Sequence, residues 1–244
     1  MTEQNKLIYL PEDWQKGLAI AAHPDDLEFG ASSAVARWTA QGKEISYAMV
    51  TCGEAGIDAM PPAETGRVRA EEERKSARIV GVDTVEFLEH RDGMVEYGLD
   101  LRRDLARMIR KYQPEMIVSL NYGLTFGGNM LNMADHRVVG LAALDGARDA
   151  SNRWIFPELL EEGLEPWEGA RMVCFTGSPT PTHGVDVTDV FHLGVASLAA
   201  HGVYLSNLSE AVNPDDYLRS FAVQAGAELG CELGVSFEVI WLQV

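Results

Sequence analysis

Short apolar runs alternate with longer amphipathic segments along most of the chain. Such short runs are typical of strands covered on both faces, and the longer segments carry apolar residues at helical spacing. We predict strands at 18–22, 44–51, 82–88, 116–120, 171–175, 185–188 and 236–244, and helices at 31–40, 67–80, 101–112 and 137–150. The first strand, helix and strand fit one βαβ unit, so the pattern predicts an α/β domain with a mostly parallel sheet.

Two stretches do not follow this pattern. Residues 57–66, which contain Pro61 and Pro62, are expected to form a mobile loop beside the carboxyl ends of the strands. Residues 154–169 are acidic, aromatic and rich in loop-forming residues. Either a lid or an oligomer contact would account for this second stretch.

Composition and charge narrow the class of protein. The 244 residues, 46% of them hydrophobic, are enough for one substantial core, so we expect a single domain, 1–244. Neither a membrane-spanning stretch nor a secretion signal is recognisable, which makes a cytoplasmic location the expectation. The formal charge of −17 argues against nucleic acid and against insertion into or binding to anionic membranes. The three cysteines are too far apart for a Cys-x-x-Cys metal site and are expected to be reduced.

The polar stretch directly after the first predicted strand is the strongest candidate for chemistry. This stretch is His23–Glu28, and Pro24 disfavours helical geometry at His23, which places it at the carboxyl end of the strand. One imidazole and three carboxylates could bind a divalent metal and leave one carboxylate to act on water. An acidic turn that caps a helix beginning at Asp26 is the alternative, and the two interpretations can coexist.

The same stretch resembles the signature of a known family. Residues 22–28, Ala-His-Pro-Asp-Asp-Leu-Glu, match the Ala-His-Pro-Asp-Asp-x-Glu hallmark of the LmbE-like, or GlcNAc-PI de-N-acetylase (PIG-L), family of zinc-dependent deacetylases. Further matches occur at 51–56, at Arg69-x-x-Glu72, at 88–93, at Asp135-His136 and at 185–201. The resemblance implies one LmbE-like deacetylase domain over 1–244. Its fold would be Rossmann-like and three-layered, with a metal site at the carboxyl ends of the strands.

The resemblance also implies roles for individual residues. His23, Asp26 and His136 would bind Zn²⁺, although two imidazoles and a carboxylate also suit Fe²⁺, Ni²⁺ or Co²⁺. Asp25 would take a proton from water during catalysis. Glu28 is expected to support a metal ligand or the start of the next helix.

Arg69 and Asp92 would contact the substrate by the same resemblance. The local sequence alone favours plainer interpretations. Arg69-x-x-Glu72 fits a solvated helix with charge pairs, and Asp92 with Gly93 fits an ordinary turn.

The chain departs from the family pattern at Met133. This residue replaces the first His of a His-Pro-Asp-His element, which is thought to stabilise the oxyanion or protonate the leaving group. A thioether cannot donate a hydrogen bond, so either another donor enters the site or the activity is weak or directed at an easier bond. His201, His183 and Tyr122 are the candidates for this donor, with His201 as the catalytic candidate. The residues at 203–204 also depart, since the family has Ser-Gln where this chain has Val-Tyr.

The function expected from these features is hydrolysis of an N-acyl group, most simply N-acetyl, on an amino sugar or sugar-linked small molecule, with secondary metabolism as one setting. The partner implied is a small N-acylated molecule, and a homo-oligomer is compatible with the sequence. The alternative is a catalytically reduced, metal-containing binding or assembly protein of the same fold. A nucleotide-binding domain is disfavoured because no Gly-x-Gly-x-x-Gly follows the first strand.

Overall fold

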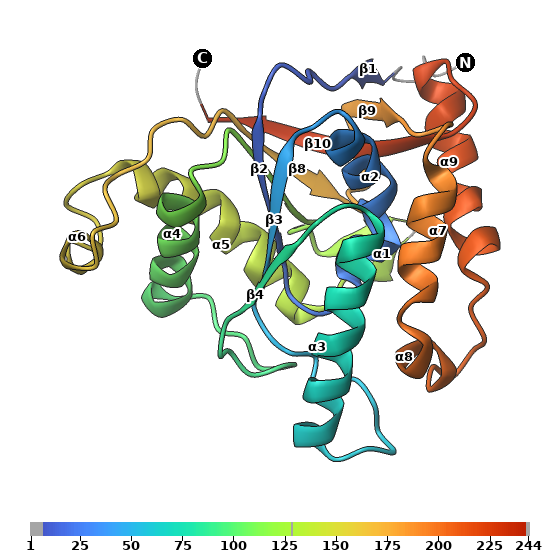
Figure 1. Ribbon diagram of the computed structural model, residues 1–244, viewed down its shortest axis with the longest axis horizontal. Helices are drawn as coiled ribbons and strands as arrows, with labels where there is room; N and C mark the ends of the chain where they lie inside the picture. Colours follow the sequence, from blue (N-terminus) through green and yellow to red (C-terminus); the bar gives the residue numbers. More distant parts are fainter. Residues whose placement is uncertain (1–6, 128, 243–244) are drawn as a thin grey trace.

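One eight-stranded sheet forms the centre of the computed structural model, which describes residues 7–127 and 129–242 (Figure 1). The strand order is β1-β9-β10-β8-β5-β2-β3-β4. Neighbouring strands are parallel except at β10, which is antiparallel to both β8 and β9. The strands of this sheet are β1 Ile8–Tyr9, β2 Lys16–Ala21, β3 Glu44–Met49, β4 Thr84–Phe87, β5 Met116–Leu120, β8 Met172–Thr176, β9 His183–Asp186 and β10 Gly234–Trp241. A separate hairpin pairs β6 Thr125–Gly127 with β7 Met130–Leu131.

Helices cover both faces of the sheet and give the expected three layers (Figure 1). Helices α4 and α5 pack together on one face, and α7 packs against α2, α3 and α9 on the other. The helices are α1 Asp26–Gly30, α2 Ser32–Ala40, α3 Pro62–Ile79, α4 Leu99–Tyr112, α5 Ala134–Ser151, α6 Glu158–Glu161, α7 Phe191–Ala199, α8 Gly202–Ser206 and α9 Pro214–Leu229. The predicted α/β fold with a mostly parallel sheet is confirmed.

Strand β2 shows why the central strands are apolar throughout. Leu18 and Ile20 belong to the core under α4 and α5, whereas Ala19 and Ala21 belong to the core under α2 and α7. Successive side chains of a strand point to opposite faces, and here both faces are covered by helices. All four side chains are fully buried.

The carboxyl ends of the central strands lie side by side and carry the polar loops. Ala21 at the end of β2 pairs with Met49 at the end of β3, and β5 lies on the other side of β2. The chain then leads from β2 into α1, and from β5 through the hairpin into α5. Two helix starts therefore meet at one edge of the sheet. No helix in the described part of the chain is long and apolar enough to cross a membrane.

Helix α3 begins earlier than predicted. It starts at Pro62 rather than at Arg67, which takes the second half of the expected loop 57–66 into the helix. Proline at the first helical position is favoured because its fixed φ suits a helix and its missing N–H would have no partner there. The expected loop is therefore shortened to residues 57–61.

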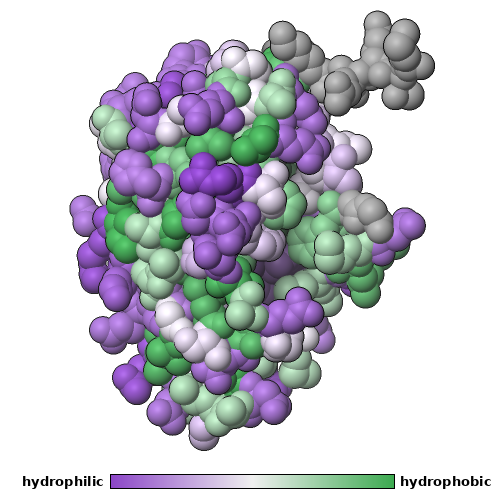
Figure 2. Space-filling model, turned by 90° about the vertical axis from the view of Figure 1, so that its right-hand side faces the viewer, coloured by the Kyte–Doolittle hydropathy of each residue, from purple (hydrophilic) through white to green (hydrophobic). Residues whose placement is uncertain are grey.

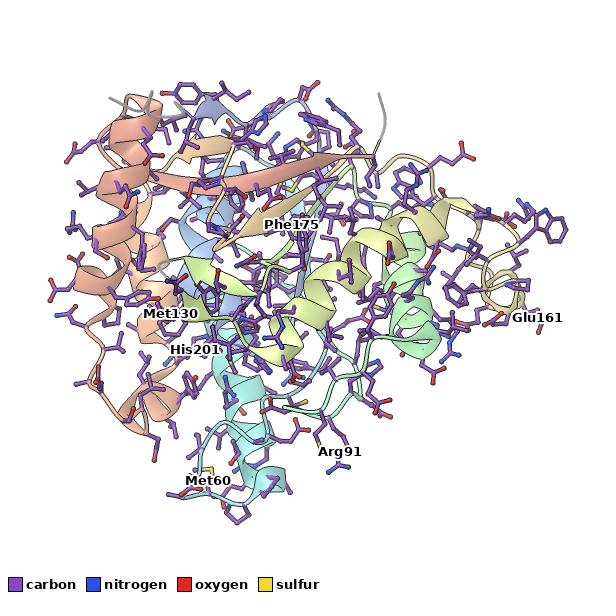
Figure 3. All side chains as sticks on the ribbon, turned by 180° about the vertical axis from the view of Figure 1, so that it is seen from behind. Met60, Arg91, Met130, Glu161, Phe175 and His201 are labelled. Atoms are coloured by element: carbon purple, nitrogen blue, oxygen red, sulfur yellow. The ribbon has the colours of Figure 1, made fainter. Side chains whose placement is uncertain are left out.

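The segment 154–169 lies away from the carboxyl ends of the central strands. It contains the short helix α6, and Trp167 Nε1 donates to the Pro114 carbonyl at 2.7 Å. In Figure 3, Glu161 of this segment is far from His201, which lies near the strand ends. The structure thus disagrees with a lid over that edge, and the oligomer contact stays a prediction.

Candidate active site

His23, in the turn after β2, converges with Asp26 of α1 and His136 of α5, as the sequence predicted. Oδ1 of Asp26 lies 2.9 Å from Nε2 of His136, and Oδ2 of Asp26 lies 3.5 Å from Nδ1 of His23. Each residue offers one ligand atom, and the three atoms lie within 4.8 Å of one another. All three residues are buried. We refer to these three residues as the metal triad.

The turn that brings Asp25 and Asp26 together is unusual. The backbone of Asp25, which follows Pro24, has a φ of 92°. Residues other than glycine rarely adopt this left-handed conformation. Asp25 makes no side-chain capping bond to α1, and the carboxylate of Asp26 instead accepts the backbone N–H of His23 at 2.7 Å. The two carboxylates therefore do not form the simple helix cap that was the alternative to a metal site.

The electrostatics of the metal triad fit a divalent cation. Burial lowers the pKa of His23, but the charges of Asp26, Asp135 and Asp92 outweigh it and raise that pKa to about 12. Burial raises the pKa of Asp26, yet His136 and His23 hold that pKa far below its usual value. Nε2 of His136 is buried 2.9 Å from Oδ1 of Asp26 but makes no hydrogen bond of regular geometry to the described residues. Two imidazole nitrogens and one ionised carboxylate are the donors that zinc prefers, so the residues present suit such an ion.

Two further carboxylates hold the ring of His23. Its Nε2 lies 3.0 Å from Asp92 and 3.2 Å from Asp135. Asp135 also accepts the backbone N–H groups of Gly93 and Val95. A carboxylate on the far nitrogen of a metal-binding imidazole fixes its orientation. Asp92 therefore contacts a metal-triad residue, and its contact with substrate stays a prediction.

Asp25 lies beside the metal triad and is held from two sides. Its Oδ1 accepts from Nη2 of Arg69 at 2.9 Å, and its backbone N–H donates to Oε2 of Glu73 at 3.1 Å. Burial raises the pKa of Asp25 to about 7, because the lowering effect of Arg69 is weaker than the burial effect and the charge of Asp26 adds to it. A base whose pKa lies near the working pH is well suited to proton transfer. The role of Asp25 as the base stays a prediction.

Arg69 is more buried than a typical substrate contact. Its side chain is 3% exposed, and its guanidinium also donates to the carbonyls of Pro24 and Gly53. The ring of Tyr204 lies over it, with 4.0 Å from Cζ to the ring centroid. Through these contacts Arg69 holds the carboxylate of Asp25 in place. The expected contact of Arg69 with substrate stays a prediction.

His201 does not face the metal triad. It is 0% exposed, and its Nε2 lies 3.6 Å from Glu28 and 3.7 Å from Glu73. Oε1 of Glu28 accepts a hydrogen bond from Ser76 at 2.7 Å. His201 therefore lies between two buried carboxylates, and its expected role as the missing donor stays a prediction. Glu28 contacts Ser76 and His201 rather than a metal-triad residue, and its expected support of a metal ligand stays a prediction.

The other two donor candidates also lie elsewhere. His183 is on β9, where its Nδ1 is 2.8 Å from Thr182 Oγ1. The hydroxyl of Tyr122 donates to Glu238 of β10 at 3.0 Å. Met133 itself precedes α5 and is 54% exposed. His183 and Tyr122 thus have hydrogen-bond partners outside the metal triad.

Sequence reasoning missed Glu73 and Tyr204. Glu73 directly follows Glu72, so its charge suggested one more solvated position on a charged helix. Tyr204 was recorded only as a departure from the family pattern. Both residues acquire their place through contacts between α3 and the region of α8, more than 120 positions apart in the chain. No local pattern carries that information.

The hairpin β6–β7 gives the site an apolar rim. Leu124, Met130 and Leu131 are each about two-thirds exposed, and the ring of Phe126 packs 5.9 Å from that of His136. Hydrophobic surface is visible on the right of Figure 2, where this hairpin lies. The hairpin therefore places apolar side chains next to the metal triad through the contact of Phe126 with His136.

Comparisons with known proteins identify relatives across nearly the whole chain. A family model described as PIG-L, GlcNAc-PI de-N-acetylase, matches residues 18–147. The chain is 27% identical over 221 residues to the diacetylchitobiose deacetylase of Thermococcus kodakarensis, which covers 89% of this chain and 80% of the relative.

Two solved structures have folds similar to that of this chain. The N,N'-diacetylchitobiose deacetylase from Pyrococcus horikoshii superposes with a TM-score of 0.84 and 26% identity, covering 94% of this chain and 85% of the other. GalB, the 4-carboxy-2-hydroxymuconate hydratase of Pseudomonas putida, has a TM-score of 0.75 at 20% identity, covering 94% and 98%. That second likeness shows the fold alone. Because the family model covers more than half of the chain, this protein belongs to the GlcNAc-PI de-N-acetylase (PIG-L) family.

Proposed function

We propose that this protein is a metal-dependent N-deacetylase that removes the acetyl group from an amino sugar or a sugar-linked small molecule. The observation that carries the proposal is the metal triad with Asp25 beside it. The names of two relatives, both diacetylchitobiose deacetylases, support the substrate class. The apolar rim suggests substrates in which the sugar bears an apolar group.

His23, Asp26 and His136 would hold the metal, with Zn²⁺ as the first choice and Fe²⁺, Ni²⁺ or Co²⁺ as alternatives. When bound, such an ion supplies a Lewis acid that increases the acidity of water and polarises the acyl group. Asp92 and Asp135 keep the His23 ring in one orientation.

Asp25 would move the proton. Arg69 holds the carboxyl of Asp25 and Glu73 holds its backbone N–H, and the carboxyl would accept a proton from the attacking water. Water oxygen then joins the acyl carbon, the C–N bond breaks, and Asp25 returns the proton to the departing amine. The products are acetate and a free amino sugar.

An acetate-release assay tests this proposal. The zinc-loaded protein is incubated with N-acetylglucosamine, N,N'-diacetylchitobiose and their alkyl and aryl glycosides. We expect equal amounts of acetate and free amine from at least one of them, with a rate lowered by roughly 10²–10⁴ in Asp25→Asn under the same conditions. Absence of acetate from every compound, with one metal ion per chain, would reject the proposal.

A metal-containing binding protein is the second candidate, and Met133 is the observation that favours it. Without the family His, the site could retain a metal and a ligand without turning the ligand over. Calorimetry separates the two functions. Tight binding of an N-acetylated glycoside that is recovered intact after long incubation would favour the binding protein.

A further inference from the structure

The backbone of Asp25 has a conformation that an aspartate does not adopt without support. Its φ of 92° lies in the left-handed region, and its side chain makes no capping bond to α1 that would stabilise the turn. Such a conformation persists only where the surrounding structure holds it. The contacts that hold Asp25 therefore decide where its carboxylate points.

Two side chains of α3 hold this turn. Arg69 and Glu73 are four positions apart, so they lie on the same face of the helix. Nη2 of Arg69 donates to the carbonyl of Pro24 at 2.6 Å and to Oδ1 of Asp25 at 2.9 Å. Oε2 of Glu73 accepts the backbone N–H of Asp25 at 3.1 Å. Arg69 thus fixes the carboxylate of Asp25, and Glu73 fixes the backbone from which that carboxylate projects.

The place of Glu73 is costly to maintain. Glu73 is 0% exposed, and its Oε2 lies 3.7 Å from Nε2 of His201, which is itself 3.6 Å from Glu28. Its Oε1 has no hydrogen-bond partner within the described ranges 7–127 and 129–242. A buried carboxylate with an unpaired oxygen is rare at positions that only fill space. Its contact with the Asp25 N–H gives Glu73 a place in the site.

The position of Asp25 in the sequence makes this contact important. Asp25 directly precedes Asp26 and lies two residues after His23, so it is flanked by two residues of the metal triad. Zinc with open coordination positions readily takes a further carboxylate oxygen. If the turn relaxed to an ordinary φ, the carboxylate of Asp25 would be free to bind such an ion. A carboxylate bound in this way would lose the ability to take a proton from water.

We propose that Glu73 is a positioning residue that keeps the carboxylate of Asp25 off the metal by holding the backbone N–H of Asp25 in the left-handed turn. The expected effect on turnover rests on the proposed deacetylase function. The expected effect on metal binding does not, because it can be measured without a substrate.

Replacing Glu73 tests the inference. Glu73→Leu removes the acceptor, keeps a similar volume and leaves Glu28 paired with His201. We expect kcat to fall by roughly 10²–10³ with KM changed less than about threefold. Zinc should bind at least about tenfold more tightly, since the ion gains a ligand. Glu73→Gln, whose amide oxygen can accept the same N–H, should restore kcat to within about tenfold of wild type.

The matched control is Glu71→Leu, which makes the same change at an exposed position of α3. It should keep the kcat, KM and zinc affinity of the wild type. If Glu73→Leu does not fold, Glu73→Met takes its place, because a flexible thioether side chain fills irregular space more easily.

Cobalt provides a readout that needs no turnover. The visible absorption of bound Co²⁺ depends on the number and geometry of its ligands. After Co²⁺ is added to metal-free protein, the spectrum of Glu73→Leu should differ from that of wild type, and Glu73→Gln should match wild type. In the Asp25→Asn background, Glu73→Leu should leave the spectrum unchanged, because the carboxylate that would join the metal is absent.

The outcomes separate the inference from the proposed function. If wild type releases acetate and Glu73→Leu keeps kcat within about threefold of it, Glu73 does not position the base, while the deacetylase function stands. A lower kcat together with weaker zinc binding would also overturn the inference, because Glu73 would then support the metal triad itself. If wild type releases no acetate from any compound, the proposed function fails and the cobalt spectra decide alone. A changed spectrum in Glu73→Leu would then support the inference, and an unchanged one would overturn it.

Discussion

Asp25 and Asp26 are neighbours in the sequence, yet they have opposite properties. The pKa of Asp25 is raised to about 7, mainly by burial, whereas that of Asp26 is held far below its usual value by two imidazoles. Two carboxylates whose environments separate their pKa values in this way typically divide the roles of base and ligand. The strained φ of Asp25 makes the division possible, because it points consecutive side chains at different partners.

Exchanging each carboxylate for an amide separates these roles. Asp25→Asn should keep one metal ion per chain and lower kcat by roughly 10²–10⁴, because an amide cannot take a proton from water. Asp26→Asn should lose most of the metal. Metal analysis and acetate release are measured on the same preparations. Finding the two phenotypes exchanged would show that base and ligand have been assigned the wrong way round.

His136 is the metal-triad residue farthest along the chain, and it tests whether α5 contributes to the site. His136→Ala removes one of two imidazole donors, so most of the metal should be lost on desalting. His192→Ala, an exposed histidine on α7, is the control and should retain one ion per chain. Full metal occupancy in His136→Ala would show that α5 contributes no metal ligand.

The signature residues could be predicted from the sequence because they are contiguous or begin a helix after a strand. His23, Asp25, Asp26 and His136 all belong to this class. The contacts around these residues could not be predicted, since His201 and Tyr204 contact Glu73 and Arg69 of α3, which are far away in the sequence. The burial of His201 between Glu28 and Glu73 was not expected, because a histidine in a sequence does not reveal whether it faces solvent or the core.

Helix α3 shows why a charged helix can be misread. Arg69, Glu72, Glu73 and Ser76 recur at three- and four-residue intervals, and all four are buried. This is the spacing of an apolar stripe, but here the stripe is polar and faces the site and α8. The strands were predictable because burial on both faces demands apolar residues. The buried polar face of α3 could not be predicted, because its partners come from elements that are distant in the sequence.

Helix α5 depends on close approach to the end of β5, and Gly140 permits it. A Cβ at position 140 would lie 2.3 Å from the carbonyl oxygen of Leu120, which cannot move without disturbing the strand. We expect Gly140→Ala to lower the free energy of unfolding by about 1–3 kcal/mol. Gly202→Ala, whose added Cβ would meet nothing within 4 Å, is the matched control. Urea unfolding measures both, and equal stabilities would show that α5 does not pack as described.

At the scale of the whole molecule, the three layers and the parallel centre of the sheet follow from the alternation of strands and helices. The order of the strands within the sheet does not follow from this alternation. Strand β10 inserts between β9 and β8 and runs antiparallel to both, although it is the last strand of the chain. Its sequence is an ordinary apolar run, and nothing local specifies either its neighbours or its direction.

The metal should also stabilise the whole fold. Asp26, Asp92 and Asp135 converge on His23, and an ion present at about 1,000 times its Kd would add about 4 kcal/mol to the stability of the folded state. For a domain of this size we expect removal of the ion by a chelator to lower Tm by roughly 10 °C. Zinc should restore Tm, and magnesium should not, since it prefers oxygen ligands. An unchanged Tm after verified removal would mean that the metal triad does not support the fold.

A zinc titration of the stripped protein tests the central claim most directly. Acetate release from the best substrate of the panel is measured after each addition of ion, with Asp25→Asn titrated in parallel. We expect activity to rise linearly and to break at one ion per chain, while Asp25→Asn binds one ion and stays inactive. Activity that is independent of metal, or that breaks at two ions per chain, would contradict a single metal triad with Asp25 as its base.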